Sequence, residues 1–183
     1  AGGLLLGGAN SSCGFEHGQV AVYGHILGDR IARAKRVAAG GRAEALSHLG
    51  PPGVVGAPPI DSVGIGYNPD YARQQMAESG FSSCRLIPPI SFAVSTLDLS
   101  LLQAELIRDM WVKELDCTEE QIILEQMQFG TLLANTRAEA GAARPDVWEL
   151  GWSSYYPDQH NWVNELLHCE DSENRMLRPC TNL

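Results

Sequence analysis

The sequence predicts an α/β fold with a short mixed or parallel sheet flanked by helices. Three strand-like apolar segments, at 85–96, 121–129 and 146–151, alternate with two helical patterns at 99–114 and 131–139. A strand–helix–strand–helix–strand order is typical of right-handed crossovers and parallel pairing. The 183 residues, 44% hydrophobic and 19% charged, suffice for one core or one lobe of a larger protein.

Two segments precede the predicted sheet. Residues 14–39 carry apolar side chains at helical spacing, and the glycine pair at 40–41 ends that pattern, so we expect a helix. Residues 49–66 hold four of the ten prolines and predict an ordered surface connection. The alternative is a flexible linker, although Val54 and Val55 give the segment side chains that can pack.

The clearest helix signal lies at 68–80. Asn68 is a good N-cap. Pro69 suits the first helical position, because the backbone N–H that proline lacks has no partner within the helix there. Asp70 favours the positive end of the helix dipole, and Gly80 ends the pattern.

The strand predicted at 85–96 is interrupted by Pro88 and Pro89. Because proline cannot donate to a ladder, we expect that end of the strand to be a sheet edge or a bulge. In the following helix, Ser100 and Gln103 fit a capping box. The apolar stripe of that helix consists of Leu102, Leu106, Ile107, Met110 and Trp111. Another helix is expected at 161–168.

The composition excludes several function classes. A net charge of -9 without a basic stripe argues against a nucleic-acid partner. No apolar run is long enough to span a membrane, and no Gly-Lys-Ser/Thr phosphate loop is present. Residues 1–18 do not have the pattern of a signal peptide and have no predicted place in the fold. We expect no cofactor.

Cysteine, histidine and serine positions do not match metal or nucleophile motifs. The five cysteines form no CxxC pair, and His160 and His168 are eight residues apart instead of the four that suit one helical face. Ser153 and Ser154 do not follow a G-x-S-x-G elbow, so we expect no enzyme activity. Two disulfides and one free thiol would suit an exported protein, and buried reduced cysteines are the alternative.

An aromatic loop follows Gly151. Five of the next eleven residues are Trp152, Tyr155, Tyr156, His160 and Trp162, set among turn residues. Because aromatic rings favour burial, such a loop either packs on its own domain or forms one wall of a ligand cleft.

Several motifs in series resemble the extracytoplasmic solute-binding proteins of family 5, the peptide/nickel class of ABC importer receptors. They are YNPDYARQQMAESGF at 67–81, the helix and strand pattern at 105–133, and GWSSYYPDQHNW at 151–162. The helix pattern at 20–34 and the Pro-Pro-Gly at 51–53 occupy their expected places upstream. The resemblance covers about residues 19–180.

This resemblance implies a periplasmic-binding-protein-like lobe at 19–183, namely the C-terminal lobe of a longer, two-lobed receptor whose N-terminal lobe is not in this sequence. It implies capture of a peptide-like or other small solute and its delivery to ABC permease subunits. The implied location is periplasmic or extracellular, at the membrane through the transporter.

The resemblance also implies ligand-binding residues. Trp152 matches the cleft tryptophan of the family, with a core tryptophan as the alternative, and Ser153 and Tyr156 belong to the same loop. Tyr155 occupies the position where peptide receptors carry an aspartate for the ligand's ammonium, a departure that favours a sugar, a modified peptide or another solute. Asp158 is expected to tie down the loop. Arg137 either reaches the cleft or is solvated on its helix.

The resemblance implies one disulfide candidate, and the predicted strands suggest another. Several family members bridge the stretch that Cys169 and Cys180 flank here. Cys84 and Cys117 each precede a strand, so a second bridge is feasible if those strands lie side by side in parallel. Cys13 is left over. A different class of function, a free-standing α/β protein-interaction domain, stays open as the alternative to the receptor.

Overall fold

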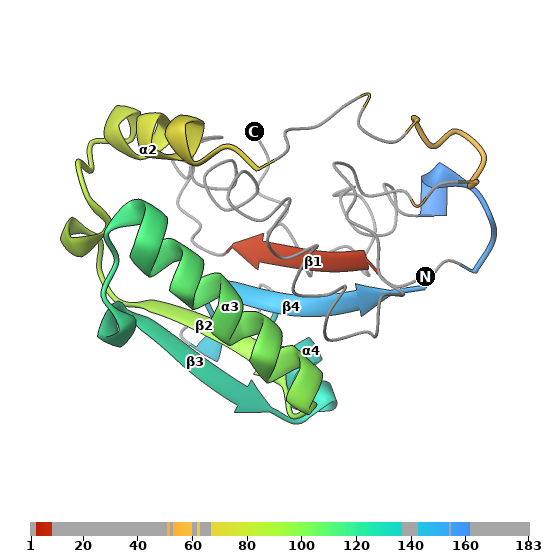
Figure 1. The fold of residues 1–183 in the computed structure, drawn as a ribbon. Coiled ribbons are helices and arrows are strands. Elements are labelled where there is room, and N and C mark those ends of the chain that lie inside the picture. Colours follow the sequence, from red (N-terminus) through yellow and green to blue (C-terminus); the bar gives the residue numbers. More distant parts are fainter. Residues whose placement is uncertain are drawn as a thin grey trace, which may run out of the picture.

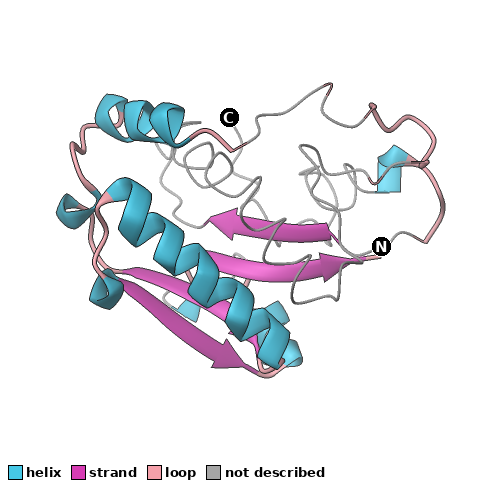
Figure 2. Ribbon diagram, in the orientation of Figure 1, coloured by secondary structure: helices cyan, strands magenta, loops and turns pink. Residues whose placement is uncertain are grey.

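The computed structural model describes residues 3–8, 51, 53–59, 62, 67–136, 143–153 and 155–161. Its α/β architecture confirms the predicted fold class (Figure 1, Figure 2). A 4-stranded sheet has the order β1-β4-β2-β3. The strands are β1 (Gly3–Gly8), β2 (Ile90–Ser95), β3 (Ile122–Met127) and β4 (Val147–Trp152). β2 pairs in parallel with β3 and β4, whereas β1 runs antiparallel to β4.

Strand β1 comes from residues that had no predicted place. Its register runs from Gly3 opposite Trp152 to Gly8 opposite Val147. Three leucines between glycine pairs show neither the alternation nor the β-branched side chains of a typical strand. Pairing with β4 therefore decides their conformation. The helix predicted at 14–39 lies outside the described residues.

Helix α2 (Pro69–Glu78) confirms the predicted N-terminal signal. The Asn68 Oδ1 atom accepts a hydrogen bond from the Tyr71 backbone N–H at 3.0 Å. Ala72 and Met76 share the buried face. Gly80, with φ of 92°, ends the segment in a left-handed conformation that favours glycine.

The strand predicted at 85–96 is wrong in its first half. Cys84–Leu86 form a short 3-10 helix, η1, and β2 begins at Ile90, after both prolines. Pro88 and Pro89 thus precede the ladder and mark neither an edge nor a bulge. β2 itself is an inner strand, between β4 and β3.

Helix α3 (Asp98–Leu115) occupies nearly its predicted range, but the predicted capping box is wrong. The N-cap is Leu97, which makes no side-chain capping bond. Ser100 and Gln103 are buried, and the Ser100 hydroxyl lies 2.9 Å from that of Ser95. The predicted stripe is also corrected, because Leu102 is 43% exposed whereas Ala104 and Leu115 lie in the core.

The bounds of the remaining elements differ from the predicted ones by a few residues. Helix α4 (Phe129–Asn135) begins before the predicted 131, and Arg137 and residues 138–142 lie outside the described part. The start of β4 is fixed to β2 because Asp146 Oδ2 accepts hydrogen bonds from Ser91 N and Ser91 Oγ, both at 2.8 Å. The predicted helix at 161–168 is described only at its first residue.

The sheet separates two hydrophobic clusters. In the larger one α3 packs on one face of the sheet and α2 packs on α3. It includes the stacked rings of Phe92 and Trp111, whose centroids are 6.0 Å apart. The smaller one contains Ala93, Leu132 and Trp148 and lies on the α4 side. Adjacent residues of β2 and β4 enter opposite clusters because side chains alternate along a strand.

A disulfide joins the segments before β2 and β3. Cys84 and Cys117 are bonded, with Cα atoms 4.7 Å apart, as the parallel arrangement of these strands made feasible. Gln121 strengthens the same junction, because its Nε2 donates to the carbonyls of Cys84 at 2.8 Å and Ile87 at 3.0 Å. Cys13, Cys169 and Cys180 lie outside the described residues.

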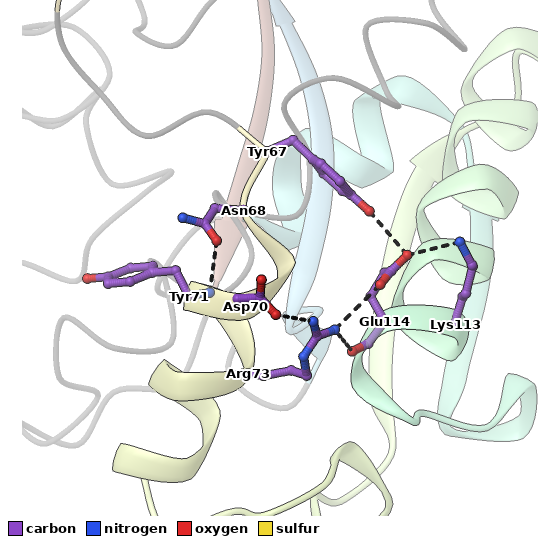
Figure 3. A network of polar contacts seen from close by, with 7 residues as sticks. All are labelled: Tyr67, Asn68, Asp70, Tyr71, Arg73, Lys113 and Glu114. Atoms are coloured by element: carbon purple, nitrogen blue, oxygen red, sulfur yellow. Dashed lines mark hydrogen bonds and ion pairs between the residues drawn. The ribbon is translucent and has the colours of Figure 1, made fainter.

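A polar network holds α2 against the end of α3 (Figure 3). Glu114 Oε1 accepts from Tyr67 Oη at 3.1 Å and lies 3.2 Å from Lys113 Nζ. Arg73 Nη1 donates to the Glu114 carbonyl at 3.0 Å, and Arg73 also pairs with Asp70. Partial burial by itself raises the pKa of the Glu114 carboxyl, but hydrogen bonds from Lys113 and Tyr67 outweigh it and lower the pKa below its ordinary value.

Candidate functional site

Three parallel strands end at one edge of the sheet, and an exposed apolar or aromatic side chain follows each end. The arrows of β2, β3 and β4 point in the same direction (Figure 1). Beyond them lie Leu97, which is 66% exposed, Phe129, which is 56% exposed, and Tyr155, which is 82% exposed. In open α/β sheets, ligands bind outside the carboxyl ends of the strands. This edge is therefore the candidate site.

The loop after β4, which we call the tyrosine loop (residues 153 and 155–161), is held by its own polar groups. Asn161 is fully buried, and its Oδ1 accepts from the Tyr155 backbone N–H at 3.2 Å. Asp158 Oδ1 accepts from the His160 backbone N–H at 2.8 Å, which caps the short turn that follows. These bonds fix the backbone while the Tyr155 ring stays in solvent.

Tyr156 and His160 form a joined pair of rings on this loop. Tyr156 Oη lies 2.7 Å from His160 Nδ1, and the ring centroids are 6.3 Å apart with an interplanar angle of 27°. The hydrogen bond holds both rings in one orientation. Together they offer a partly exposed aromatic surface on which a flat or apolar group can stack.

A second segment, which we call the strap (residues 53–59), supports the loop from outside. The Val55 backbone N–H donates to the Pro157 carbonyl at 3.0 Å, and the Val55 carbonyl accepts from the Gln159 N–H at 2.8 Å. Val55 and Asp158 form an isolated parallel β-bridge. In Figure 1 the orange strap lies next to the blue loop.

The structure brings most of the predicted site residues together. Ser153, Tyr155 and Tyr156 are exposed on the tyrosine loop, and Asp158 is half-buried and tied to the loop backbone. Trp152 is the last residue of β4, and its side chain lies outside the described part of the chain, as does Arg137. The roles of all six predicted residues in ligand binding stay predictions.

Three residues of this region were not predicted from the sequence. Leu97 and Phe129 each come two residues after the end of a strand, and this position relative to the sheet was a usable signal. Val55 was expected to pack, but its side chain is 66% exposed. Its backbone contact gave no local signal, because the strap lies about a hundred residues before the loop. Only the folded chain shows that contact.

The site offers rings and hydroxyls more than charge. Among the described residues of the strap and the tyrosine loop, the acidic and basic side chains are Asp158 and His160 alone. No group of three or more His, Cys, Asp or Glu gathers in a metal-binding arrangement within the described part. Nor does any described helix have the length and apolar character that crossing a membrane requires.

Comparison with known proteins gives matches in structure only. No family model matches the sequence, and no curated protein matches it. The fold is similar to a periplasmic oligopeptide-binding protein of an oligopeptide ABC transporter from Borrelia burgdorferi, with a TM-score of 0.71 at 15% identity, over 96% of this chain and 32% of that one.

Two further solved structures have a similar fold. The murein tripeptide binding protein MppA of Escherichia coli gives a TM-score of 0.71 at 14% identity, over 97% of this chain and 34% of that one. The oligopeptide-binding protein AppA of Bacillus subtilis was solved in complex with a nonapeptide. It gives a TM-score of 0.71 at 16% identity, over 96% of this chain and 36% of that one. The chain spans about a third of the length of these proteins and has the periplasmic-binding-protein-like fold of that part of them.

Proposed function

We propose that this chain is part of the solute-binding component of an ABC importer. It would hold a peptide-like or other small solute at the carboxyl edge of the sheet and release it to permease subunits. The observation that carries the proposal is the tyrosine loop, where Tyr155 is 82% exposed at the end of β4 on a backbone fixed by hydrogen bonds. Rigid, exposed rings are suited to contact many ligands without requiring one sequence.

The structural neighbours support this proposal. They include a periplasmic oligopeptide-binding protein of an ABC transporter, and complexes with a nonapeptide and with the peptide RPPGFSPFR. By analogy, we place this chain in the periplasm or outside the cell, and we assign it binding without catalysis. Because the chain spans about a third of such proteins, we also propose that a second lobe completes the site.

The test is native mass spectrometry of the complete protein that carries this chain, purified without refolding. We expect a small solute to be retained. We also expect peptide or sugar pools to raise the melting temperature, and Tyr155→Ala to reduce that increase by at least half. Leu86→Ala is the matched control, because Leu86 is 61% exposed but lies in η1, before β2 and away from the carboxyl edge. No retained solute together with no thermal shift would contradict the proposal and favour a protein partner.

A further inference from the structure

Val55 combines a fixed backbone with an exposed side chain. Both backbone polar groups of Val55 bond to the tyrosine loop, to Pro157 at 3.0 Å and to Gln159 at 2.8 Å. The side chain is nevertheless 66% exposed. A valine whose backbone is bonded in this way to the loop that carries Tyr155 and Tyr156 adds apolar area at a defined position in the site.

The described residues of the strap and the tyrosine loop carry little available charge. Asp158, the acidic residue among the described positions of strap and loop, is half-buried, and one of its carboxylate oxygens accepts from the His160 backbone N–H. The His160 ring bonds Tyr156 through Nδ1. The large hydrophobic side chains that the described residues of the strap and the loop expose are Val55, Tyr155 and Tyr156. These side chains suit contact with an apolar or aromatic group of a solute.

We infer that Val55 is a specificity-determining residue of the solute site, and that the surface it shares with Tyr155 and Tyr156 selects solutes that carry an apolar or aromatic group. This inference rests on the proposed function and adds to it the chemical class of the solute. The strap both positions the loop, through the backbone of Val55, and contributes to selectivity, through its side chain.

Gly56 brings the strap and the loop together. Its φ is 78°, and a Cβ atom at this position would lie 3.4 Å from Gln159 Cβ. Glycine therefore permits both the turn of the strap and its close approach to the loop. Gly80 also has a positive φ, 92°, but an added Cβ there would meet nothing within 4 Å. The two glycines form a matched pair with the same backbone constraint and different surroundings.

The experiment is affinity selection by mass spectrometry. The complete protein is incubated with an equimolar pool of tri- to pentapeptides of mixed composition, and bound peptides are quantified. We expect the wild type to enrich peptides rich in Phe, Tyr, Leu and Val. Val55→Thr keeps the shape of the side chain and replaces a methyl by a hydroxyl. We expect it to reduce this enrichment at least threefold while total bound peptide changes less than twofold. Ile123→Thr, at an exposed β-branched residue of β3 outside the strap, should change neither quantity.

The outcomes separate the inference from the proposed function. If Tyr155→Ala lowers total binding but Val55→Thr leaves the enrichment unchanged, the site stands and the role of Val55 is refuted. If the wild type binds no member of the pool, the peptide-binding proposal fails and the inference fails with it.

A second measurement tests the positioning role of the strap. We expect Gly56→Ala to lower total bound peptide at least fivefold, because a side chain at this positive φ strains the strap at the point where it bonds to the loop. Gly80→Ala should leave binding unchanged, and circular dichroism verifies that both variants are folded. Equal binding by the two variants would show that the strap does not position the loop.

Discussion

Glu114 is a carboxylate whose polar partners come from three places in the chain. Its side chain is 14% exposed. It accepts a hydrogen bond from Tyr67, in the segment before α2, and pairs with Arg73 of α2 and Lys113 of its own helix. Removing the charge of this carboxylate weakens its hydrogen bonds and ion pairs, but the Arg73 and Lys113 side chains are 47% and 58% exposed, so water limits the cost. The network therefore links the docking of α2 to the ionisation of one residue.

This linkage predicts an acid-sensitive contribution to stability. The pKa of Glu114 is lowered in the folded state relative to the ordinary value of 4.5, because the hydrogen bonds from Lys113 and Tyr67 outweigh the burial that opposes them. The stabilisation is fully present above that ordinary value and is lost as the pH falls through the lower, folded-state pKa. Glu114→Gln should cost about 1 kcal/mol at neutral pH.

Urea unfolding of wild type and Glu114→Gln across acidic and neutral pH measures this effect. The stability difference should be constant near neutrality and shrink as the pH falls well below 4.5. Glu119→Gln is the control, because Glu119 is exposed in the short helix η2 (Glu119–Gln121). If wild type and Glu114→Gln differed in stability by the same amount at every pH, the lowered pKa of Glu114 would be contradicted.

At the scale of elements, two short helices fix the starts of neighbouring strands. η1 and η2 precede β2 and β3, and the disulfide Cys84–Cys117 and the Gln121 side chain connect them. Arg85 lies 3.0 Å from Asp116, and hydrogen bonds from Arg85 and Ser83 lower the pKa of the Asp116 carboxyl. This junction holds the amino ends of the two strands in register, opposite the candidate site.

The disulfide should stabilise the fold measurably. The bridge closes a loop with a sequence separation of 33 residues. Loop entropy for such a closure amounts to about 3.5 kcal/mol. We expect the double variant Cys84→Ser, Cys117→Ser to be less stable by about 2–4 kcal/mol in urea unfolding. A peptide map without reductant should contain the crosslinked pair, and alkylation of both thiols in unreduced, denatured protein would refute the bond.

Prediction of elements succeeded where the signals were local. Asn68 and Pro69 placed the start of α2, because capping depends only on residues within one turn. Ser100 and Gln103 satisfied the same kind of rule and were assigned wrongly, since tertiary packing buries both. Leu102 fits the helical period but is partly exposed, because period alone does not say how wide a face the sheet covers.

At the scale of the whole molecule, the described sheet is asymmetric. β2 has a partner on each side, whereas β3 is the outer strand next to it in the described part of the chain. Phe92, Ala93 and Val94 of β2 are fully buried, whereas β3 exposes Ile123, Glu125 and Gln126. The most stable part of the fold should therefore be β2 and its contacts with α3.

Hydrogen exchange followed by mass spectrometry tests this order. Amides of residues 90–95 should exchange through global unfolding, and those of 122–127 at least tenfold faster on average. The physical reason is that an outer strand opens without breaking a second ladder. Equal protection of the two segments would indicate that further chain covers β3.

The sequence by itself determined the α/β class, the start of α2, the parallel direction of β2, β3 and β4, and an aromatic loop after the last of them. These follow from periodicity, capping and turn chemistry, which act over a few residues. Only the tertiary structure decided that residues 3–8 pair with β4 and that Val55 bonds to the tyrosine loop. Such long-range contacts depend on where the backbone groups of distant segments meet, and no local pattern encodes that position.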